Sequence, residues 1–87
     1  MQILTARGCE AVGRRVRNGF RVKAGSRISP DVAESFKMQR IQYGERLFLI
    51  AEGIVRDDVF SRDYTFISAA YAASVISGMH GREKMWK

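Results

Sequence analysis

Few residues in this sequence are suited to disulfide, metal or covalent chemistry. The 87 residues include one cysteine, Cys9, and one histidine, His80. A single cysteine excludes an intrachain disulfide, and one Cys with one His is too few for a structural zinc site. Neither residue belongs to a nucleophile motif, and no phosphate loop, dinucleotide fingerprint or nuclease signature occurs elsewhere. The sequence therefore predicts no metal, no cofactor and no catalytic activity of its own.

Long apolar runs are also absent. No stretch approaches the roughly 18 consecutive apolar residues of a membrane span, and residues 1–10 lack the apolar centre of a secretory signal. Hydrophobic residues make up 46% and charged residues 28% of the chain, as in ordinary globular domains. Residues 1–87 are therefore expected to form one small globular domain in the reducing cytoplasm, away from membranes.

Acidic residues are scarce at the two ends of the chain. Residues 1–27 carry seven Arg or Lys and one Glu, whereas residues 28–66 carry five basic and seven acidic residues. Residues 67–87 add three basic residues and one acidic residue, so the net charge of +6 is concentrated at the ends. Such clusters attract polyanions, nucleic acid above all. A solvated surface that only keeps the protein soluble has the same composition.

The most basic stretch, residues 14–26, has the pattern of a β-hairpin. A two-residue loop at Asn18-Gly19 would place arginines opposite the apolar residues of the second strand. A three-residue loop that also includes Arg17, with Gly19 in the left-handed conformation, aligns the apolar residues of both strands instead. Because a shift of one residue turns every side chain to the other face, the apolar pattern favours the three-residue loop.

This register divides the hairpin into two faces. The buried face is predicted to consist of Val12, Val16, Phe20, Val22 and Ala24, with Arg14 as an exception at an edge. The exposed face is predicted to hold Arg15, Arg21 and Lys23, with Arg17 at the tip. Most basic side chains of the hairpin would then point to one side, while Arg14 would extend its stem along apolar surface.

The middle of the chain has helical features. Ser29-Pro30-Asp31 is typical of a helix start, because serine caps, proline fits the first turn and aspartate favours the positive end of the helix dipole. We expect an interruption at Tyr43-Gly44, then a helix from Glu45 to Glu52 that ends at Gly53. Phe48 and Leu49 make this segment apolar nearly all round, which predicts cover on more than one side. Its inward residues are expected to be Leu47, Ile50 and Ala51.

Short strands and a second helix are expected in the remaining segments. Residues 3–6, residues 64–66 and the segments on either side of Asp57-Asp58 predict strands. Ser68 is expected to cap a helix, AAYAASVIS, that stops at Gly78, and the alanines of this helix predict close packing on a sheet. The chain is therefore expected to adopt an α+β fold, with a small antiparallel sheet of three to five strands and helices packed on one face.

The chain resembles a small bacterial domain family of unknown function in three blocks, GFRVKAGS (19–26), RDYTFISAAYAASVISG (62–78) and MWK (85–87). This family is found near the C-terminus of nuclease-like proteins, those of GIY-YIG type included, and of restriction or modification-associated proteins. The matching positions are Gly19, Phe20, Val22, Gly25, Ser26, Asp63, Tyr64, Phe66, Ser68, Ala72, Ala73, Gly78, Trp86 and Lys87.

This sequence departs from the family pattern in two places. Ala69 and Ala70 replace the Pro and second Ser of a Ser-Pro-Ser block, and a lone Gly81 stands where the family has Asn-Gly. If that second serine contacts a ligand in relatives, its loss weakens binding here. The resemblance implies an accessory module in DNA restriction, modification or repair, with no established catalytic role.

These features favour a nucleic-acid-binding domain that contacts the phosphate backbone of DNA. The predicted contacts are Arg15, Arg17, Arg21, Lys23, Arg27, Arg82 and Lys84. Ser68 is a second candidate, because the free amides at a helix N-terminus favour a phosphate. Trp86 has two interpretations, a side chain that stacks on a base or one that plugs the core.

The alternative is a protein-interaction or homodimerisation module without a nucleic-acid role. The segment RLFLIAEGIV (46–55) motivates it, because a small domain has little with which to cover both sides of so apolar a helix. Phe48 or Leu49 would then belong to the interface. The solution mass and an assay of duplex DNA binding distinguish the two classes of function.

Overall fold

The computed structural model describes every residue of the chain, 1–87. Four strands form an antiparallel sheet in the order β1-β2-β3-β6, and two more form the hairpin β4-β5. The strands are β1 (Gln2–Ala6), β2 (Cys9–Val16), β3 (Gly19–Val22), β4 (Val55–Arg56), β5 (Val59–Phe60) and β6 (Tyr64–Phe66). The helices are α1 (Arg40–Ala51), α2 (Ala69–Ser77) and the short 3-10 turns η1 (Glu34–Met38) and η2 (Glu83–Met85).

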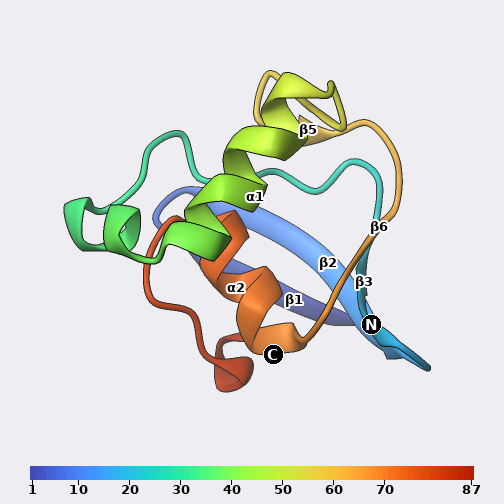
Figure 1. Ribbon diagram of the computed structural model, residues 1–87. Coiled ribbons are helices and arrows are strands. Elements are labelled where there is room, and N and C mark those ends of the chain that lie inside the picture. Colours follow the sequence, from blue (N-terminus) through green and yellow to red (C-terminus); the bar gives the residue numbers. More distant parts are fainter.

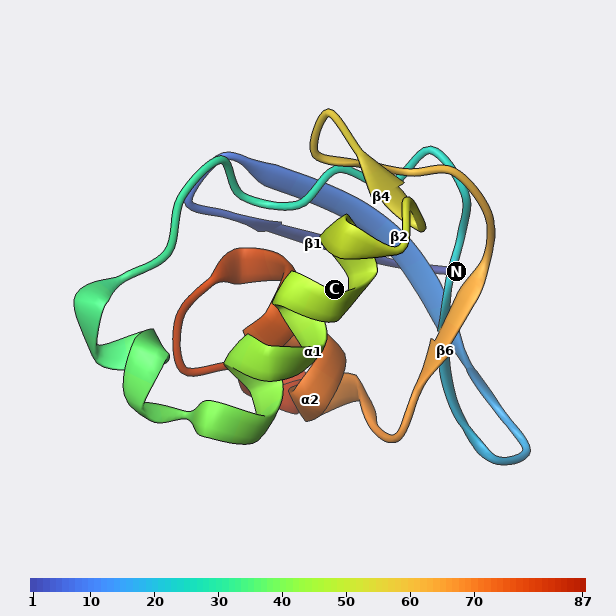
Figure 2. The same ribbon diagram turned by 45° about the horizontal axis from the view of Figure 1, so that its top comes forward.

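Both α-helices lie on the same side of the four-stranded sheet, one above the other (Figure 1). α2 packs directly on all four strands of the sheet, and α1 packs on α2 and β4. The layers therefore follow the order sheet, α2, α1, and the opposite face of the sheet has no helix over it in either view (Figure 2). This arrangement confirms the predicted α+β fold with helices on one face. The uncovered side of the sheet is called the outer face below.

Small residues allow α2 to lie close to the sheet, as its alanines predicted. Ala69, Ala72 and Ala73 are all buried. The residues of β2 from Cys9 to Gly13 that point toward the helix are also small, namely Cys9, Ala11 and Gly13. Because both surfaces lack bulk, the backbones of strand and helix can approach one another closely.

The ends of α2 are those that the sequence predicts. The Ser68 side chain accepts a hydrogen bond from the Tyr71 amide at 3.1 Å, which satisfies one free donor of the first turn. Gly78 ends the helix at φ 69°, a left-handed conformation that glycine adopts without steric cost. Local sequence alone therefore fixes both boundaries of this helix.

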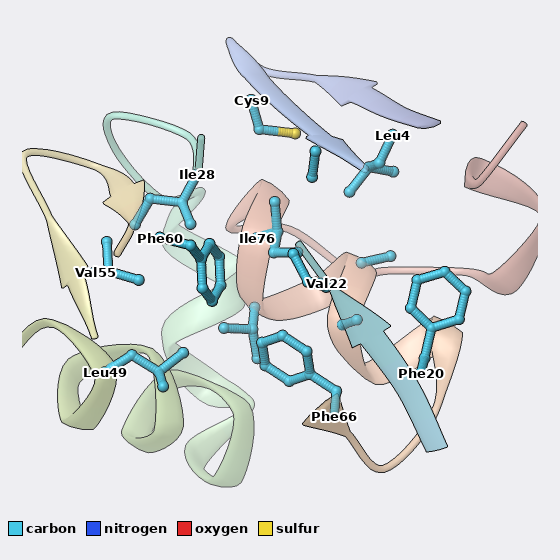
Figure 3. Packing of buried hydrophobic residues seen from close by; sticks show 14 of the residues in the cluster. Leu4, Cys9, Phe20, Val22, Ile28, Leu49, Val55, Phe60, Phe66 and Ile76 are labelled. Atoms are coloured by element: carbon cyan, nitrogen blue, oxygen red, sulfur yellow. The ribbon is translucent and has the colours of Figure 1, made fainter. Parts of the chain in front are cut away.

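Aromatic and branched side chains fill the space between the sheet and the helices (Figure 3). Trp86 closes one end of this core and is only 3% exposed. Its ring centroid lies 4.5 Å from that of Phe20, and its indole Nε1 donates to the Ala69 carbonyl at 2.9 Å. Trp86 is thus a core plug, and its ring is not free to stack on a base.

The register of the first hairpin differs from the predicted one. Val16 pairs with Gly19 and Arg15 with Phe20, so the loop contains two residues, Arg17 and Asn18. Val12, Arg14 and Val16 therefore lie on the outer face, and Arg15 points to the helical side. The prediction of a three-residue loop was wrong. It considered only how many apolar residues turn inward and took no account of how closely α2 packs on β2.

Close approach between backbones explains this outcome. On the core side of β2, α2 leaves room for small side chains and not for the valines. A Cβ on Gly13 would overlap the Phe20 ring, and a Cβ on Gly19 would overlap the carbonyl oxygen of Phe66. Glycine is thus needed at position 19 so that β3 can approach β6 closely. The sequence had predicted a different role, a left-handed residue in the hairpin loop.

The first helix begins later than expected and is not interrupted. Ser29-Pro30-Asp31 forms no helix start, and the chain reaches η1 only at Glu34. α1 then runs without a break through Tyr43-Gly44. Gly53 follows its C-terminus as predicted, with its amide bonded to the Ile50 carbonyl at 3.2 Å.

α1 also turns a different side inward. Leu47, Ile50 and Ala51 are exposed, while Arg46 and Leu49 are buried. Arg46 is satisfied inside the protein because its Nη1 donates to the Val75 carbonyl at 2.8 Å and to the Ser29 side chain at 3.1 Å. The helix is covered on one side only, contrary to the prediction. The helix with cover on both sides is α2.

Candidate nucleic-acid interface

The outer face carries basic side chains from several segments of the chain. Strand pairing and the backbone bonds at the sheet margins place five of them there, Arg14, Arg21, Lys23, Arg27 and Lys87. Arg17 lies beside them in the exposed hairpin loop. None of the six takes part in the three ion pairs of the structure. The outer face therefore presents six basic side chains that form no ion pair.

Arg14 and Arg21 stand directly opposite each other on neighbouring strands. Cβ atoms of such pairs are about 4.5–5.5 Å apart, and like charges at this distance destabilise a sheet. Arg21 Nε donates to the Thr65 hydroxyl at 3.4 Å, which holds its side chain against β6. An anion placed between the two guanidinium groups would relieve their repulsion and accept hydrogen bonds from both.

Lys23 lies where β3 ends in a tight turn. The turn closes with a hydrogen bond from the Ser26 amide to the Lys23 carbonyl at 3.1 Å and passes through Gly25 at φ 90°. The buried Ser26 side chain accepts from the Val12 amide at 3.0 Å, so it satisfies a backbone donor that β3 has left unpaired. A shallow hollow of about 410 Å³ opens here, lined by Ile3, Glu10, Val12, Lys23, Ala24, Gly25 and Ser26.

Two further basic residues reach the outer face through backbone pairing outside the strands. Arg27 and Glu10 exchange backbone hydrogen bonds of 2.8 and 2.9 Å, which places their side chains on the same side. Lys87 pairs in the same way with Ile3, at 2.8 and 3.3 Å, at the opposite margin of the sheet. Two acidic residues lie near them: Glu10 beside Arg27, and Asp63, which follows the pairing of β3 with β6 and accepts a hydrogen bond from the Ala24 amide at 2.9 Å.

Three of the predicted contact residues lie elsewhere. Arg15 points to the helical side, where it forms an ion pair with Glu83. Arg82 and Lys84 belong to the segment around η2, which packs against α2. The structure thus brings together Arg17, Arg21, Lys23 and Arg27 and separates them from the other three. The expectation that Arg15 shares a face with Arg21 and Lys23 was wrong, because Arg15 pairs with Phe20 and so points to the same side as that buried residue.

Ser68 is occupied by its own helix. Its hydroxyl bonds the Tyr71 amide, and the recess of about 210 Å³ beside it has no Arg or Lys in its wall. The recess is lined by Gln39, Gln42, Ser68, Ala70, Tyr71, Ser74, His80 and Gly81. The free amides in the first turn of α2 therefore have no Arg or Lys beside them in this recess to strengthen the binding of a phosphate.

Arg14 and Lys87 belong to this face although they were not among the predicted contact residues. A signal for Arg14 was present, because Cys9, Ala11 and Gly13 alternate as small residues and match the alanines of α2. Because successive side chains of a strand point to opposite faces, a strand that turns these three residues inward turns Arg14 outward. No local signal existed for Lys87, whose position depends on a backbone pairing with the other end of the chain.

A second polar cluster lies on the helical side of the sheet. The Glu45 carboxylate accepts hydrogen bonds from the Tyr64 and Tyr71 hydroxyls, each at 2.9 Å. Burial, followed by these bonds to a negative partner, raises the pKa of both tyrosines to about 12. The cluster ties α1 to β6 and α2, and it lies apart from the outer face.

The single cysteine belongs to the core. Cys9 is buried, and burial raises the pKa of its thiol. A raised pKa lowers the fraction of thiolate, the form that reacts and binds metals. Cys9 therefore serves as a small apolar residue under α2.

None of the helices has the length and apolar character needed to cross a lipid bilayer. The longest, α1, has 12 residues.

Comparison with protein families gives one match over nearly the whole chain. A family model described as a domain of unknown function, DUF4357, covers residues 2–87. The chain belongs to the DUF4357 family. No curated protein and no solved structure matches it. The DUF4357 match agrees with the resemblance to a small domain family of unknown function and spans every segment that builds the outer face.

Proposed function

We propose that this DUF4357 domain binds the phosphate backbone of DNA through the outer face of its sheet. The observation that carries this proposal is the opposed pair Arg14 and Arg21 on an uncovered sheet face, where neither residue forms an ion pair. Two like charges directly opposite each other on neighbouring strands destabilise the sheet, and an anion between them would relieve this repulsion. A repeating polyanion satisfies this pair and its basic neighbours together.

The composition of the outer face supports contact with backbone over contact with bases. Between the charged residues, the strands contribute Ile3, Thr5, Val12, Val16 and Thr65 to this face. It has no aromatic side chain on which an unpaired base could stack, which is how single strands are commonly held. Phosphate contacts without base contacts position a protein and give affinity with little sequence preference. Duplex DNA is therefore the proposed ligand.

The biological setting proposed for the domain follows from the resemblance noted in the sequence. It would act as an accessory module of restriction, modification or repair proteins in the bacterial cytoplasm, nuclease-like proteins among its hosts. In that setting, a binding face without base readout would raise the local concentration of DNA near a separate catalytic unit. The domain itself would contribute binding and no chemistry.

Two matched triple variants test the proposal. Replacing Arg14, Arg21 and Lys23 with Gln removes three charges from the outer face. Replacing Arg15, Arg82 and Lys84 with Gln removes the same three charges from the helical side. We expect fluorescence anisotropy with a labelled duplex to show at least a tenfold weaker affinity for the first variant and little change for the second, because the face and not the net charge determines binding.

The salt dependence provides an independent readout. About four or five phosphate contacts predict that affinity falls by a factor on the order of 10²–10³ between 50 and 200 mM salt. The variant of Arg14, Arg21 and Lys23 should have a shallower slope by about two to three contacts. Equal loss of affinity in both variants, or affinity that does not respond to salt, would refute the proposed face.

A further inference from the structure

The side of α1 that faces away from the protein is almost entirely apolar. Ile41 is 75% exposed, Phe48 51%, Leu47 49% and Ile50 46%. Gly44 and Ala51 lie among them, and Gly44 has open space where a Cβ would be. Since α1 is the outermost layer (Figure 1), no other element of the chain covers this side. Apolar patches of this kind typically mark an interaction site.

The helix is held in this orientation by polar contacts on its inner side. Arg46 donates to the Val75 carbonyl and to Ser29, and Glu45 accepts from Tyr64 and Tyr71. A helix that only maximised its buried apolar area would turn Leu47 and Phe48 inward. Specific hydrogen bonds therefore keep the more apolar side of α1 toward solvent.

We propose that this side of α1 binds the same helix of a second copy of the chain, in an antiparallel two-fold dimer. The argument for a second copy is charge complementarity along the helix. Arg40 begins α1 and Glu52 follows its last residue, and neither forms an ion pair within the chain. Antiparallel helices place the start of one beside the end of the other, so two Arg40–Glu52 pairs would close the interface.

The same two-fold arrangement fits large side chains against small ones. When Arg40 lies opposite the partner's Glu52, Gly44 lies opposite the partner's Phe48. Ile41 then lies opposite the partner's Ala51. Each ring would fill the open space above a glycine, which is the interdigitation that closely packed helices require.

The size of the surface predicts a weak and reversible dimer. α1 is about 18 Å long at 1.5 Å per residue, so one of its sides is smaller than the roughly 800 Å² per partner of a standard interface. We expect a dissociation constant on the order of 10–1,000 µM. This inference does not depend on DNA binding, because α1 and the outer face lie on opposite sides of the sheet.

Sedimentation of the full chain without DNA, from about 10 µM to about 1 mM, tests this interface. The average mass should rise from 9.9 kDa toward twice that value. Phe48→Glu should raise the dissociation constant at least tenfold, because it buries a charge beside Gly44. Ile67→Glu is the matched control, since Ile67 is 75% exposed outside α1 and its replacement should leave the mass unchanged.

A charge exchange tests the orientation of the two helices. Arg40→Glu and Glu52→Arg should each weaken the dimer, and the double variant should restore it. Circular dichroism would verify that every variant is folded. A chain that remains monomeric at about 1 mM, an equal effect of Phe48→Glu and Ile67→Glu, or failure of the double variant to recover would overturn the proposal. A monomer would leave this side of α1 to a different partner.

Discussion

Arg46 of α1 donates a hydrogen bond to the Val75 carbonyl in the last turn of α2, at 2.8 Å. Carbonyls in the last turn of a helix have no partner within the helix, and they carry the negative end of its dipole. A buried arginine is therefore stable here without a carboxylate beside it. The same guanidinium bonds Ser29, which fixes the segment between β3 and η1 against both helices.

Arg46→Met should destabilise the protein because it leaves Ser29 and the Val75 carbonyl without donors in a buried place. We expect the free energy of unfolding to fall by about 2–4 kcal/mol, as measured by urea denaturation. Arg40→Met is the control on the same helix. At low protein concentration, where the chain is monomeric and this side chain is exposed, its effect should stay within about 0.5 kcal/mol. Equal effects at the two positions would show that the buried hydrogen bonds of Arg46 add nothing to the stability of the fold.

Gly13 on β2 has no room for a Cβ and Gly44 on α1 has open space, so replacement by alanine should have opposite effects at the two positions. Gly13→Ala should cost about 1–3 kcal/mol, because its Cβ would overlap Phe20 and lie 2.9 Å from the Arg21 carbonyl oxygen. Gly44→Ala should stabilise the folded chain by about 0.5–1 kcal/mol, since the Cβ enters open space and alanine favours the helix. Thermal unfolding at low protein concentration, where the chain is monomeric, measures both. A stabilising Gly13→Ala would contradict the close packing of α2 on β2.

The Glu45 cluster predicts a loss of stability at high pH. Tyr64 and Tyr71 have folded pKa values of about 12, above the ordinary tyrosine value of about 10. Folding therefore favours the neutral hydroxyls, and this contribution is complete below about pH 10 and is lost as pH rises toward 12. In Glu45→Gln, the pKa of both tyrosines should fall toward the ordinary value, as followed by the absorbance of tyrosinate. Unchanged titration curves would show that the carboxylate does not hold these hydroxyls.

Substitutions of Trp86 distinguish its role in the stability of the fold from a role in DNA binding. Trp86→Ala should cost about 3–5 kcal/mol, because it empties the end of the core beside Phe20. Trp86→Phe should cost less, with loss of the hydrogen bond to Ala69 and part of the volume. Since the indole does not reach the outer face, the folded Trp86→Phe variant should bind duplex DNA as the native chain does. A selective loss of DNA affinity in that variant would restore the base-stacking interpretation.

Several elements of the fold were predictable because their signals are local. Ser68 and Gly78 mark the ends of α2 through a side-chain cap and a left-handed residue, and both involve only neighbouring atoms. The same holds for the β4-β5 hairpin, where Asp57 and Asp58 adopt positive φ values in a two-residue turn. The wrong predictions concern orientation. Which face of β2 and which side of α1 turn inward depends on the element packed against each.

The sequence by itself determined the class of fold, the boundaries of α2 and the surplus of positive charge, because propensity, caps and composition act over a few residues. Only the tertiary structure decided that Arg14 joins Arg21 on the outer face while Arg15 meets Glu83. The close contact with α2 admits small side chains alone, so it selects the register against the apolar pattern of the hairpin. In the same way, Arg46 donates to carbonyls of α2 that lie far away in the sequence, and these bonds hold α1 with its apolar side toward solvent.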